Sequence, residues 1–496
     1  MYLLGYDIGS SSIKASLVSA DSGEVITSSF SPEKEMEIVS CHSGWAEQDP
    51  EIWWKHVINT TQKIIKNRRV DVKKIRAIGI SYQMHGLVMI DKNKKILRKS
   101  IIWCDSRAVE IGKKAFKQIG SKHCFERYLN SPGNFTASKL KWVKDYEPQI
   151  YSKIYKIMLP GDYIAWRMTG KIRTTPEGLS EAILWDFKKN NVALDVLDCF
   201  GISHDFIPEL APTFSFQGEL TKQAADELGL HPSTPITYRA GDQPNNAFSL
   251  GVLNTGEIAA TAGTSGVIYG ISNRRKCEKK SRVNIFLHVN HTKEDPRYGV
   301  LLCINGTAIL NSWLKNNLLS FKNEIDYHTM DRIAHKAPIG SDGLIVLPFG
   351  NGAERIFENK DIGCQIVNLK FNTHSTAHLL RAVQEGIVFS MKYGLDVMKK
   401  MGVKVHLIKA GYANMFLSPV FHQAFSDVTG ASLELYDTSG SSGAARAAGY
   451  GAGIYKKITD SFIGLKKIKT ITPDKENVKK YREVYYNWLN TLNKNL

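Results

Sequence analysis

The two stretches that decide the fold are Gly5-Tyr6-Asp7-Ile8-Gly9-Ser10-Ser11-Ser12-Ile13-Lys14 and Ala262-Gly263-Thr264-Ser265-Gly266-Val267. Each has an apolar strand, a turn made of Gly, Ser or Thr, and a second strand. A turn of this composition can point backbone N–H groups and hydroxyls into one concavity, which suits a phosphate. Because the copies stand about 250 residues apart, they predict two related domains that hold one chain of phosphates between them.

The composition is typical of a large globular chain. With 496 residues, 43% of them hydrophobic and 23% charged, it has room for two domains and a substantial core. The start does not fit a signal peptide, and no apolar run approaches the roughly 18 residues of a membrane span. The seven scattered cysteines never form a Cys-x-x-Cys pair, which favours reduced thiols. We therefore expect a cytoplasmic protein that does not bind membranes.

The formal net charge is +17, which raises the question of a nucleic-acid partner. The lysines come in small clusters, and none is interleaved with aromatic residues as a single-strand binder requires. We expect a solvated basic surface and no nucleic-acid binding. A positive field would also help to collect an anionic nucleotide.

Apolar periodicity and helix caps predict an alternation of strands and helices. The strands are expected over 2–8, 13–18, 24–30, 75–81, 87–91, 101–105, 258–261, 267–271, 343–348, 405–410 and 432–436. The helices are expected from Asp49-Pro50 onward and over 108–118, 138–146, 307–316, 377–401, 419–429, 444–453 and 481–492. The domain boundary is expected near 245–257.

Two carboxylates stand where such a fold places chemistry. Asp7 ends the first strand beside the first turn, where it would repel a phosphate unless a cation such as Mg²⁺ lay between them. Asp242 follows a strand that ends in Gly241, and a carboxylate there can accept the proton of a sugar hydroxyl that attacks phosphorus. The alternatives are a strand-end Asp that caps its own turn and a helix N-cap.

A third candidate site is the strand connection Gln83-Met84-His85-Gly86. It carries two hydrogen-bonding side chains and one soft apolar side chain, a mixture that suits sugar recognition. Trp103 lies toward the end of the next predicted strand and can share the same cleft. The alternative for His85 is a structural role. No Walker A or Rossmann sequence is present, so phosphates must be held by the two turns.

At these residues the chain resembles the FGGY family of carbohydrate kinases over nearly its whole length. The stretches that carry the resemblance are 5–14, 45–54, 83–86, 102–107, 159–163, 167–170, 241–242, 263–267 and 382–386. The resemblance implies an α/β protein with an actin-like ATPase fold, in which two ribonuclease-H-like domains, 1–252 and 253–496, flank a catalytic cleft. It implies transfer of the γ-phosphoryl group of ATP, with Mg²⁺, to a sugar hydroxyl. It is also compatible with a homodimer.

The resemblance implies a role for each matching position. Asp242 matches the catalytic base and Asp7 the acidic residue of the first phosphate motif, and both are expected at the Mg²⁺. The residues expected at the sugar are Gln83, Met84, His85, Trp103, Asp242 and Gln243. Those expected at ATP are Ser10, Ser11, Ser12, Lys14, Gly263, Thr264, Ser265, Gly306, Gly411 and Asn414. Met84 and His85 match the pair that marks kinases of D-xylulose, so the expected product is D-xylulose 5-phosphate.

Several positions depart from the family pattern. Tyr82 stands where a Gly is usual, Gln243 where an Asn is usual, and Tyr412 interrupts a Gly-rich stretch near the adenosine; the segment 351–356 also differs. The alternatives are a kinase of another ketose or a deoxysugar (ribulose, fuculose or rhamnulose type), a catalytically silent sugar or nucleotide sensor, and an actin- or Hsp70-like ATPase. Retained Asp7 and Asp242 disfavour the sensor, and the Gln-Met-His-Gly segment disfavours the ATPase.

Overall fold

Two large β-sheets form the framework of the computed structural model, which describes residues 1–68, 70–319 and 325–496. The six strands of the first sheet are, in spatial order, β13 (Phe214–Glu219), β14 (Pro235–Gly241), β5 (Ile75–Tyr82), β1 (Tyr2–Ile8), β2 (Ile13–Ser19) and β3 (Val25–Ser31). The seven strands of the second are β17 (Asn284–Leu287), β18 (Tyr298–Ile304), β16 (Gly266–Ser272), β15 (Glu257–Ala262), β21 (Leu407–Gly411), β22 (Ser432–Asp437) and β23 (Lys466–Ile471).

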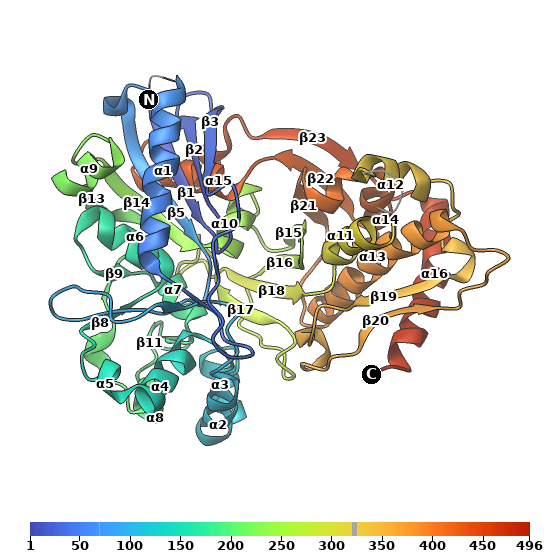
Figure 1. The fold of residues 1–496 in the computed structure, drawn as a ribbon, viewed down its shortest axis with the longest axis horizontal. Helices are drawn as coiled ribbons and strands as arrows, with labels where there is room; N and C mark the ends of the chain where they lie inside the picture. The colour runs from blue at the N-terminus through green and yellow to red at the C-terminus, as the bar shows by residue number, and fades with distance from the viewer. Residues whose placement is uncertain (69, 320–324) are drawn as a thin grey trace.

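The two sheets share one topology. In the first, β1, β2 and β3 are antiparallel, β5 and β14 continue the sheet in parallel from β1, and β13 closes it antiparallel. In the second, β15, β16 and β18 take the antiparallel places, β21 and β22 the parallel ones, and β23 the last. Each sheet forms the centre of one lobe (Figure 1). This duplication confirms the predicted α/β class and actin-like fold.

Helices cover the sheets and fill the connections. Those of the first half are α1 (Pro50–Arg68), α2 (Val109–Ile119), α3 (Ser121–Arg127), α4 (Thr136–Tyr146), α5 (Pro148–Tyr151), α6 (Pro160–Thr169), α7 (Pro176–Glu181), α8 (Leu194–Phe200), α9 (Lys222–Leu228) and α10 (Asp242–Ser249). Those of the second half are α11 (Ala308–Asn317), α12 (Tyr327–Ala334), α13 (Thr376–Lys400), α14 (Pro419–Thr429), α15 (Gly440–Gly451) and α16 (Lys475–Asn493). Among the described residues, no helix is long and apolar enough to cross a membrane.

Pairs of short strands complete the secondary structure. They are β4 (Glu47–Gln48) with β7 (Ser100–Ile101), β6 (Val88–Ile90) with β8 (Lys156–Met158), β9 (Arg173–Thr174) with β12 (Glu209–Leu210), β10 (Trp185–Asp186) with β11 (Asn191–Val192), and β19 (Ile345–Phe349) with β20 (Gly363–Val367). All except the last pair belong to the first half of the chain. There they lie in the segments that connect the strands of the first sheet.

The central strand β1 is buried on both faces, which explains its nearly continuous apolar sequence. On one face Tyr6 reaches α1, where its hydroxyl lies 2.6 Å from that of Thr61. On the other face α15, from the opposite end of the chain, lies against the same sheet (Figure 1). A Cβ at Gly5 would come within 2.0 Å of the carbonyl oxygen of Ser441, and one at Gly79 equally close to that of Ala444. Only glycine allows this close helix-to-sheet contact.

The helix predicted over 444–453 begins four residues earlier than expected. Ser439 is its N-cap, and its side-chain oxygen accepts a hydrogen bond from the backbone N–H of Ser442 (3.2 Å). The Gly-Ser-Ser-Gly segment is therefore the first turn of α15 and not a loop. The small residues of this helix allow its close packing against the first sheet.

The predicted strand over 101–105 is wrong beyond Ile101. β7 ends there, and the buried carboxylate of Asp105 instead accepts hydrogen bonds from the backbone N–H groups of Ala46 (2.6 Å) and Arg107 (2.9 Å). The Arg107 guanidinium pairs with the same carboxylate and lies 3.8 Å from the ring centroid of Trp45. This local polar network turns the chain, because a side-chain acceptor replaces the ladder hydrogen bonds of a strand.

The edge strand β17 joins the second lobe to the first. The side-chain amide of Asn130 donates to the carbonyl of Ile285 (2.7 Å), and its oxygen accepts from the N–H of the same residue (3.0 Å). Ser180 accepts from the N–H of Leu287 (3.0 Å).

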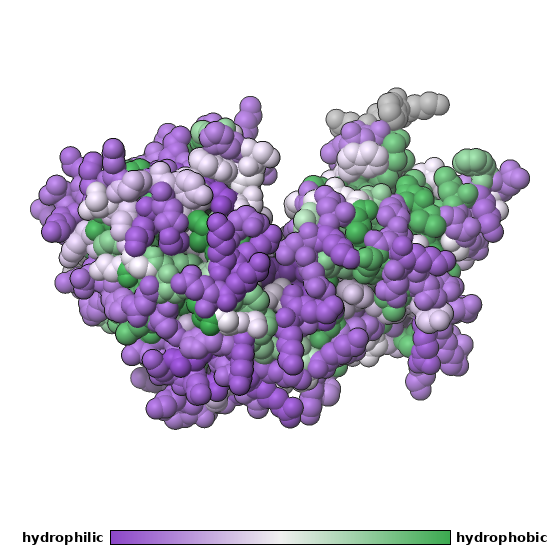
Figure 2. Space-filling view, turned by 90° about the horizontal axis from the view of Figure 1, so that it is seen from below, coloured by the Kyte–Doolittle hydropathy of each residue, from purple (hydrophilic) through white to green (hydrophobic). Residues whose placement is uncertain are grey.

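Seen from below, the surface is largely hydrophilic and is indented between the lobes (Figure 2).

Candidate active site

Asp7 lies at the end of β1, beside the first turn. Ser81 on the neighbouring strand β5 donates a hydrogen bond to its Oδ1 (3.0 Å). Burial raises the pKa of Asp7, and this outweighs the lowering by the Lys14 charge and the Ser81 hydrogen bond. A Cβ at Gly440 would lie 2.7 Å from Asp7 Oδ2. The first turn of α15 therefore closes one side of the carboxylate, with its positive helix end toward the negative group.

The first turn, between β1 and β2, is held from two sides. Gly9 donates to the carbonyl of Ser12 (3.2 Å). Gln48 donates to the carbonyl of Ser10 (2.7 Å), and the N–H of Met36 to that of Ser11 (2.8 Å). The contacts from Gln48 and Met36 use carbonyl oxygens of the turn, so these two residues orient it without occupying its backbone N–H groups. Such a turn suits an anion, as predicted.

Asp242 is the first residue of α10 and follows directly on β14. β14 runs parallel to β5, with Gly241 opposite Tyr82. The carboxyl ends of β1, β5 and β14 thus meet at one edge, where α/β proteins bind ligands. Burial and the negative charge of Asp7 raise the pKa of Asp242 to about 7. The tertiary structure therefore brings the two predicted carboxylates within electrostatic reach of each other.

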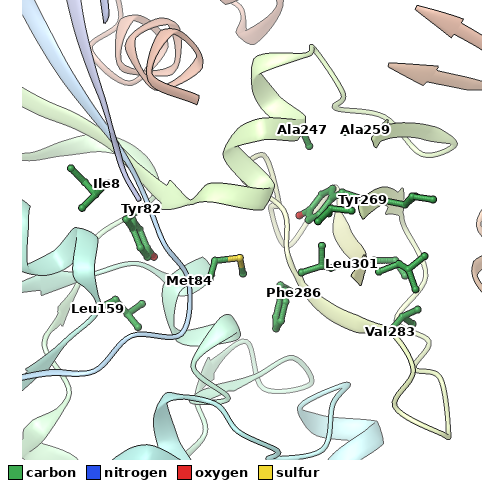
Figure 3. Close-up of a cluster of buried hydrophobic side chains, with 14 of the residues drawn as sticks. Ile8, Tyr82, Met84, Leu159, Ala247, Ala259, Tyr269, Val283, Phe286 and Leu301 are labelled. Carbon is green, nitrogen blue, oxygen red and sulfur yellow. The ribbon is translucent and has the colours of Figure 1, made fainter. Parts of the chain in front are cut away.

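The predicted sugar residues lie in the connection that follows β5. Met84 is buried against Gly241, and Figure 3 shows it next to Tyr82 in the cluster that also contains Phe286. His85 packs edge-on against Phe135, with ring centroids 4.9 Å apart, and against Phe286 of β17 at 5.5 Å. Both lobes therefore contribute to the surroundings of His85.

The hydrogen bonding of His85 fixes its tautomer. Nδ1 lies 3.0 Å from the carbonyl oxygen of Glu181, which can only accept, so Nδ1 carries the proton. Burial lowers the pKa of His85 to about 3, which keeps the ring neutral. Nε2 is then a hydrogen-bond acceptor and can accept from a hydroxyl group. The carbonyl of His85 accepts from the buried ammonium of Lys139 (2.9 Å), which anchors the turn.

Three further predicted residues differ in where they point. Trp103 is 49% exposed and its indole N–H donates to Ser10 Oγ (3.3 Å), which links the sugar side to the first turn. Gln83 is buried and its amide points to Gln48 Oε1 (3.4 Å), inside the first lobe. Gln243 is half-buried next to Asp242, and its amide groups act to lower the pKa of that carboxyl.

Tyr82 does not lie on the sugar surface. Its ring is buried against α6, where a Cβ at Gly161 would come within 2.1 Å of it, and its hydroxyl approaches Gly178 of α7. The extra side chain thus fills the interior beneath the sugar residues. Sequence position alone could not show this, because the alternation of a strand depends on which face packs inward.

The second Gly/Thr/Ser turn borders a cavity of about 620 Å³ in the second lobe. Its walls include the predicted residues Gly263, Thr264 and Asn414, together with the departing residue Tyr412. A cavity of this size holds a nucleoside. α10, which begins at Asp242, contacts β15 and β16, the two strands that the second turn connects.

Gly306 and Gly411 lie at the margin of this region and do not line the cavity. The backbone N–H groups of Asn305 and Gly306 donate to the two carboxylate oxygens of Glu354 (3.0 and 2.9 Å). A Cβ at Gly306 would meet the carbonyl oxygen of Pro348 at 2.0 Å. Gly306 thus allows close packing of backbones, and Gly411 ends β21.

A separate cavity of about 780 Å³ lies where α7, the segment after β17 and the end of α15 meet. Glu177 lines it next to Thr213, buried at 7% exposure. Burial raises the pKa of this carboxyl from 4.5 to about 7. None of the predicted site residues borders this cavity.

We predict that Glu177→Gln stabilises the protein at pH 8 relative to wild type. A carboxyl whose pKa is higher in the folded than in the unfolded state favours folding below pH 4.5, and this contribution is lost as the pH rises to 7, by about 3 kcal/mol. Glutamine stays neutral and avoids the loss. The unfolding temperatures of both proteins at pH 5 and pH 8 measure the effect; an equal difference at both values would contradict it.

Sequence reasoning did not identify Ser81, Lys139, Glu181, Phe286 or the N-terminus of α15 as parts of this region. Lys139 and Glu181 lie on helices without a recognisable motif, and Phe286 comes from an edge strand of the other lobe. Only the run of small residues in α15 gave a signal, and it did not specify which sheet they contact.

Comparison with known proteins agrees with this geometry. The model of the N-terminal domain of the FGGY family of carbohydrate kinases matches residues 2–249, and that of the C-terminal domain matches residues 258–452. The chain belongs to the FGGY family of carbohydrate kinases. It is an ATP-dependent sugar phosphotransferase.

The FGGY kinase is similar to several proteins with names that specify a substrate. It is 27% identical to the xylulose kinase of Bacillus subtilis (strain 168) over 490 residues, which cover 98% of this chain and 95% of the relative. The structure of a xylulose kinase from Rhodospirillum rubrum superposes with a TM-score of 0.88 at 24% identity, covering 100% of this chain and 99% of that one. A gluconate kinase from Lactobacillus acidophilus gives 0.87 at 22%, covering 99% and 98%. These two structures share the fold of the FGGY kinase.

Proposed function

We propose that this kinase phosphorylates a ketose, and that its substrate is D-xylulose, which yields D-xylulose 5-phosphate. The observation that supports this most is that Asp242 and Asp7 lie at one edge of the first sheet, within electrostatic reach of each other, while the second Gly/Thr/Ser turn borders a cavity in the other lobe. The neutral His85 beside Met84, and the similarity to xylulose kinases, support the choice of sugar.

In the proposed mechanism Asp242 accepts the proton of the attacking hydroxyl. Its raised pKa, near 7, makes it basic enough to take the proton while a large fraction stays ionised at neutral pH. His85 Nε2 accepts a hydrogen bond from the sugar and orients it. The first turn, at 9–12, and the second, at 263–265, hold the phosphates of ATP from opposite lobes, and Lys14 adds positive charge.

Mg²⁺ fits the acidic part of this site. Asp7 and Asp242 are two half-buried carboxylates whose charges repel each other, and a cation relieves this repulsion. No group of three or more His, Cys, Asp or Glu side chains able to hold a metal occurs in the described part of the chain. This suits Mg²⁺, which keeps waters and needs only one or two carboxylates. When bound, it neutralises the charge that develops on the phosphates.

We further propose that residues 1–252 form the sugar-binding domain, which also holds the first phosphate turn and Asp242. Residues 253–496 form the nucleotide-binding domain, except that α15 returns to the first sheet. Closure of the domains on the sugar would exclude water as a competing acceptor. A homodimer remains a prediction.

The test is ATP consumption by the purified protein with Mg²⁺ against a panel of free ketoses that includes D-xylulose, ribulose and deoxysugars. Fast turnover with D-xylulose alone is expected. If another ketose is preferred, the proposed mechanism stands and the assignment of D-xylulose as the substrate is wrong. If none of the sugars is turned over, the sensor is favoured. Hydrolysis of ATP in the absence of any sugar would favour the ATPase.

A further inference from the structure

Glu181 carries a buried carboxyl that the mechanism above does not use. It ends α7, its side chain is 2% exposed, and neither carboxyl oxygen has a hydrogen-bond partner in the described part of the chain. The Tyr82 hydroxyl and the backbone of His85 lie close enough to lower the pKa of this carboxyl, but neither reaches hydrogen-bond geometry with it. Buried polar groups are almost always partnered in native proteins, so two unpartnered oxygens on one carboxyl require an explanation.

The carboxyl lies directly beside the proposed sugar site. A Cβ at Gly241 would be 3.1 Å from Glu181 Oε2 and 2.8 Å from Met84 Cγ, so the carboxyl and the thioether meet at the residue before Asp242. Oε2 is 3.9 Å from Nδ1 of His85. Glu181 therefore lies next to the positions of three residues assigned to the sugar, which are Met84, His85 and Asp242. Figure 3 shows Met84 of this group with Tyr82 on one side and Phe286 on the other.

We propose that Glu181 is a further substrate-binding residue, which hydrogen-bonds one hydroxyl of the sugar and helps to determine which ketose is accepted. This inference rests on the proposed function. Met84 and the carboxyl border the same point at Gly241, and Met84, being unbranched, moves at little cost to admit the hydroxyl. The sugar then supplies the partner that the free protein lacks.

The protonation state of Glu181 suits this role. Burial, and then the negative charge of Asp242, raise its pKa well above the usual range, which favours the neutral carboxyl. A neutral carboxyl offers one O–H donor and a carbonyl acceptor, and a sugar hydroxyl can use both. It also adds no charge that would compete with Asp7 and Asp242 for the cation.

The test compares Glu181→Leu, which removes both hydrogen-bonding groups, with Glu181→Gln, which retains a donor and an acceptor. Ketose dissociation constants are measured by calorimetry without ATP, for D-xylulose and its monodeoxy analogues. We expect about tenfold weaker binding of D-xylulose by the leucine variant, the scale of one hydrogen bond, and less than threefold for the glutamine variant. One monodeoxy analogue lacks the hydroxyl that Glu181 recognises. Wild type and Glu181→Leu should have equal dissociation constants for that analogue.

The matched control is Glu177→Leu, which removes a buried carboxyl from the same helix, away from the predicted site residues. It should leave ketose affinity unchanged. The unfolding temperature of Glu181→Leu should equal or exceed that of wild type, because an unpartnered polar group is replaced by an apolar one. If the leucine variant does not fold, Glu181→Met supports the same comparison.

Two results would overturn this assignment alone: binding of D-xylulose by Glu181→Leu as tight as by wild type, or an equal loss for D-xylulose and every monodeoxy analogue, which indicates a structural role. Failure of the wild-type protein itself to bind any ketose would overturn the proposed function together with it. The wild-type measurement therefore separates the two failures.

Discussion

Asp242→Asn should lower kcat for the ketose by about 100-fold or more, the scale of general-base catalysis. Asparagine has nearly the same shape but cannot accept the proton of the attacking hydroxyl. Because Asp242 begins α10 with its backbone in place, the sugar and nucleotide surfaces should be preserved. Ketose binding should therefore stay within a few-fold of wild type, and the loss should appear in kcat under saturating ketose and ATP.

The matched control for this variant is Asp226→Asn, which changes an exposed carboxylate on α9 and should leave kcat unchanged. The same assignment predicts the pH dependence. Wild-type kcat/KM for the ketose should fall as the pH drops below about 7, because the base becomes protonated. Near-normal turnover by Asp242→Asn would refute the assignment of the base.

Asp7→Asn should raise the Mg²⁺ concentration required for half-maximal activity, with a loss of about 10- to 100-fold in activity at fixed Mg²⁺, as for outer-shell partners of metal sites. Asparagine retains the hydrogen bond from Ser81 but loses the negative charge next to the first turn. The measurement is a Mg²⁺ titration of the initial rate at saturating ATP and ketose. Ketose affinity without ATP should not change.

A second readout separates this role from damage to the fold. The charge of Asp7 raises the pKa of Asp242, so its removal should move the acidic limb of kcat/KM for the ketose to lower pH. Ser81→Ala serves as the control, because it removes the neighbouring hydroxyl and keeps the charge. An unchanged Mg²⁺ requirement together with an unchanged pH profile would exclude a role for Asp7 at the cation.

Most of the strand pattern was predictable because it is local. The first three strands, the Asp49-Pro50 helix start and the Ser418-capped helix α14 depend on alternation, caps and turn residues that act over a few positions. The error after Ile101 has a tertiary cause. Asp105 binds the backbone of Ala46, some 60 residues earlier, and no local pattern reports such a partner.

The sequence by itself determined the two Gly/Ser/Thr turns, the positions of the carboxylates Asp7 and Asp242, the Met84-His85 pair and the duplicated α/β pattern, because each depends on residue types at short spacing. Tertiary structure alone decided that α15 returns to the first sheet and meets Asp7, that Tyr82 fills the interior, and that Glu181 lies unpartnered beside Gly241. These contacts join segments up to about 430 residues apart. They depend on the complementary shapes of packed elements, which short-range periodicity does not encode.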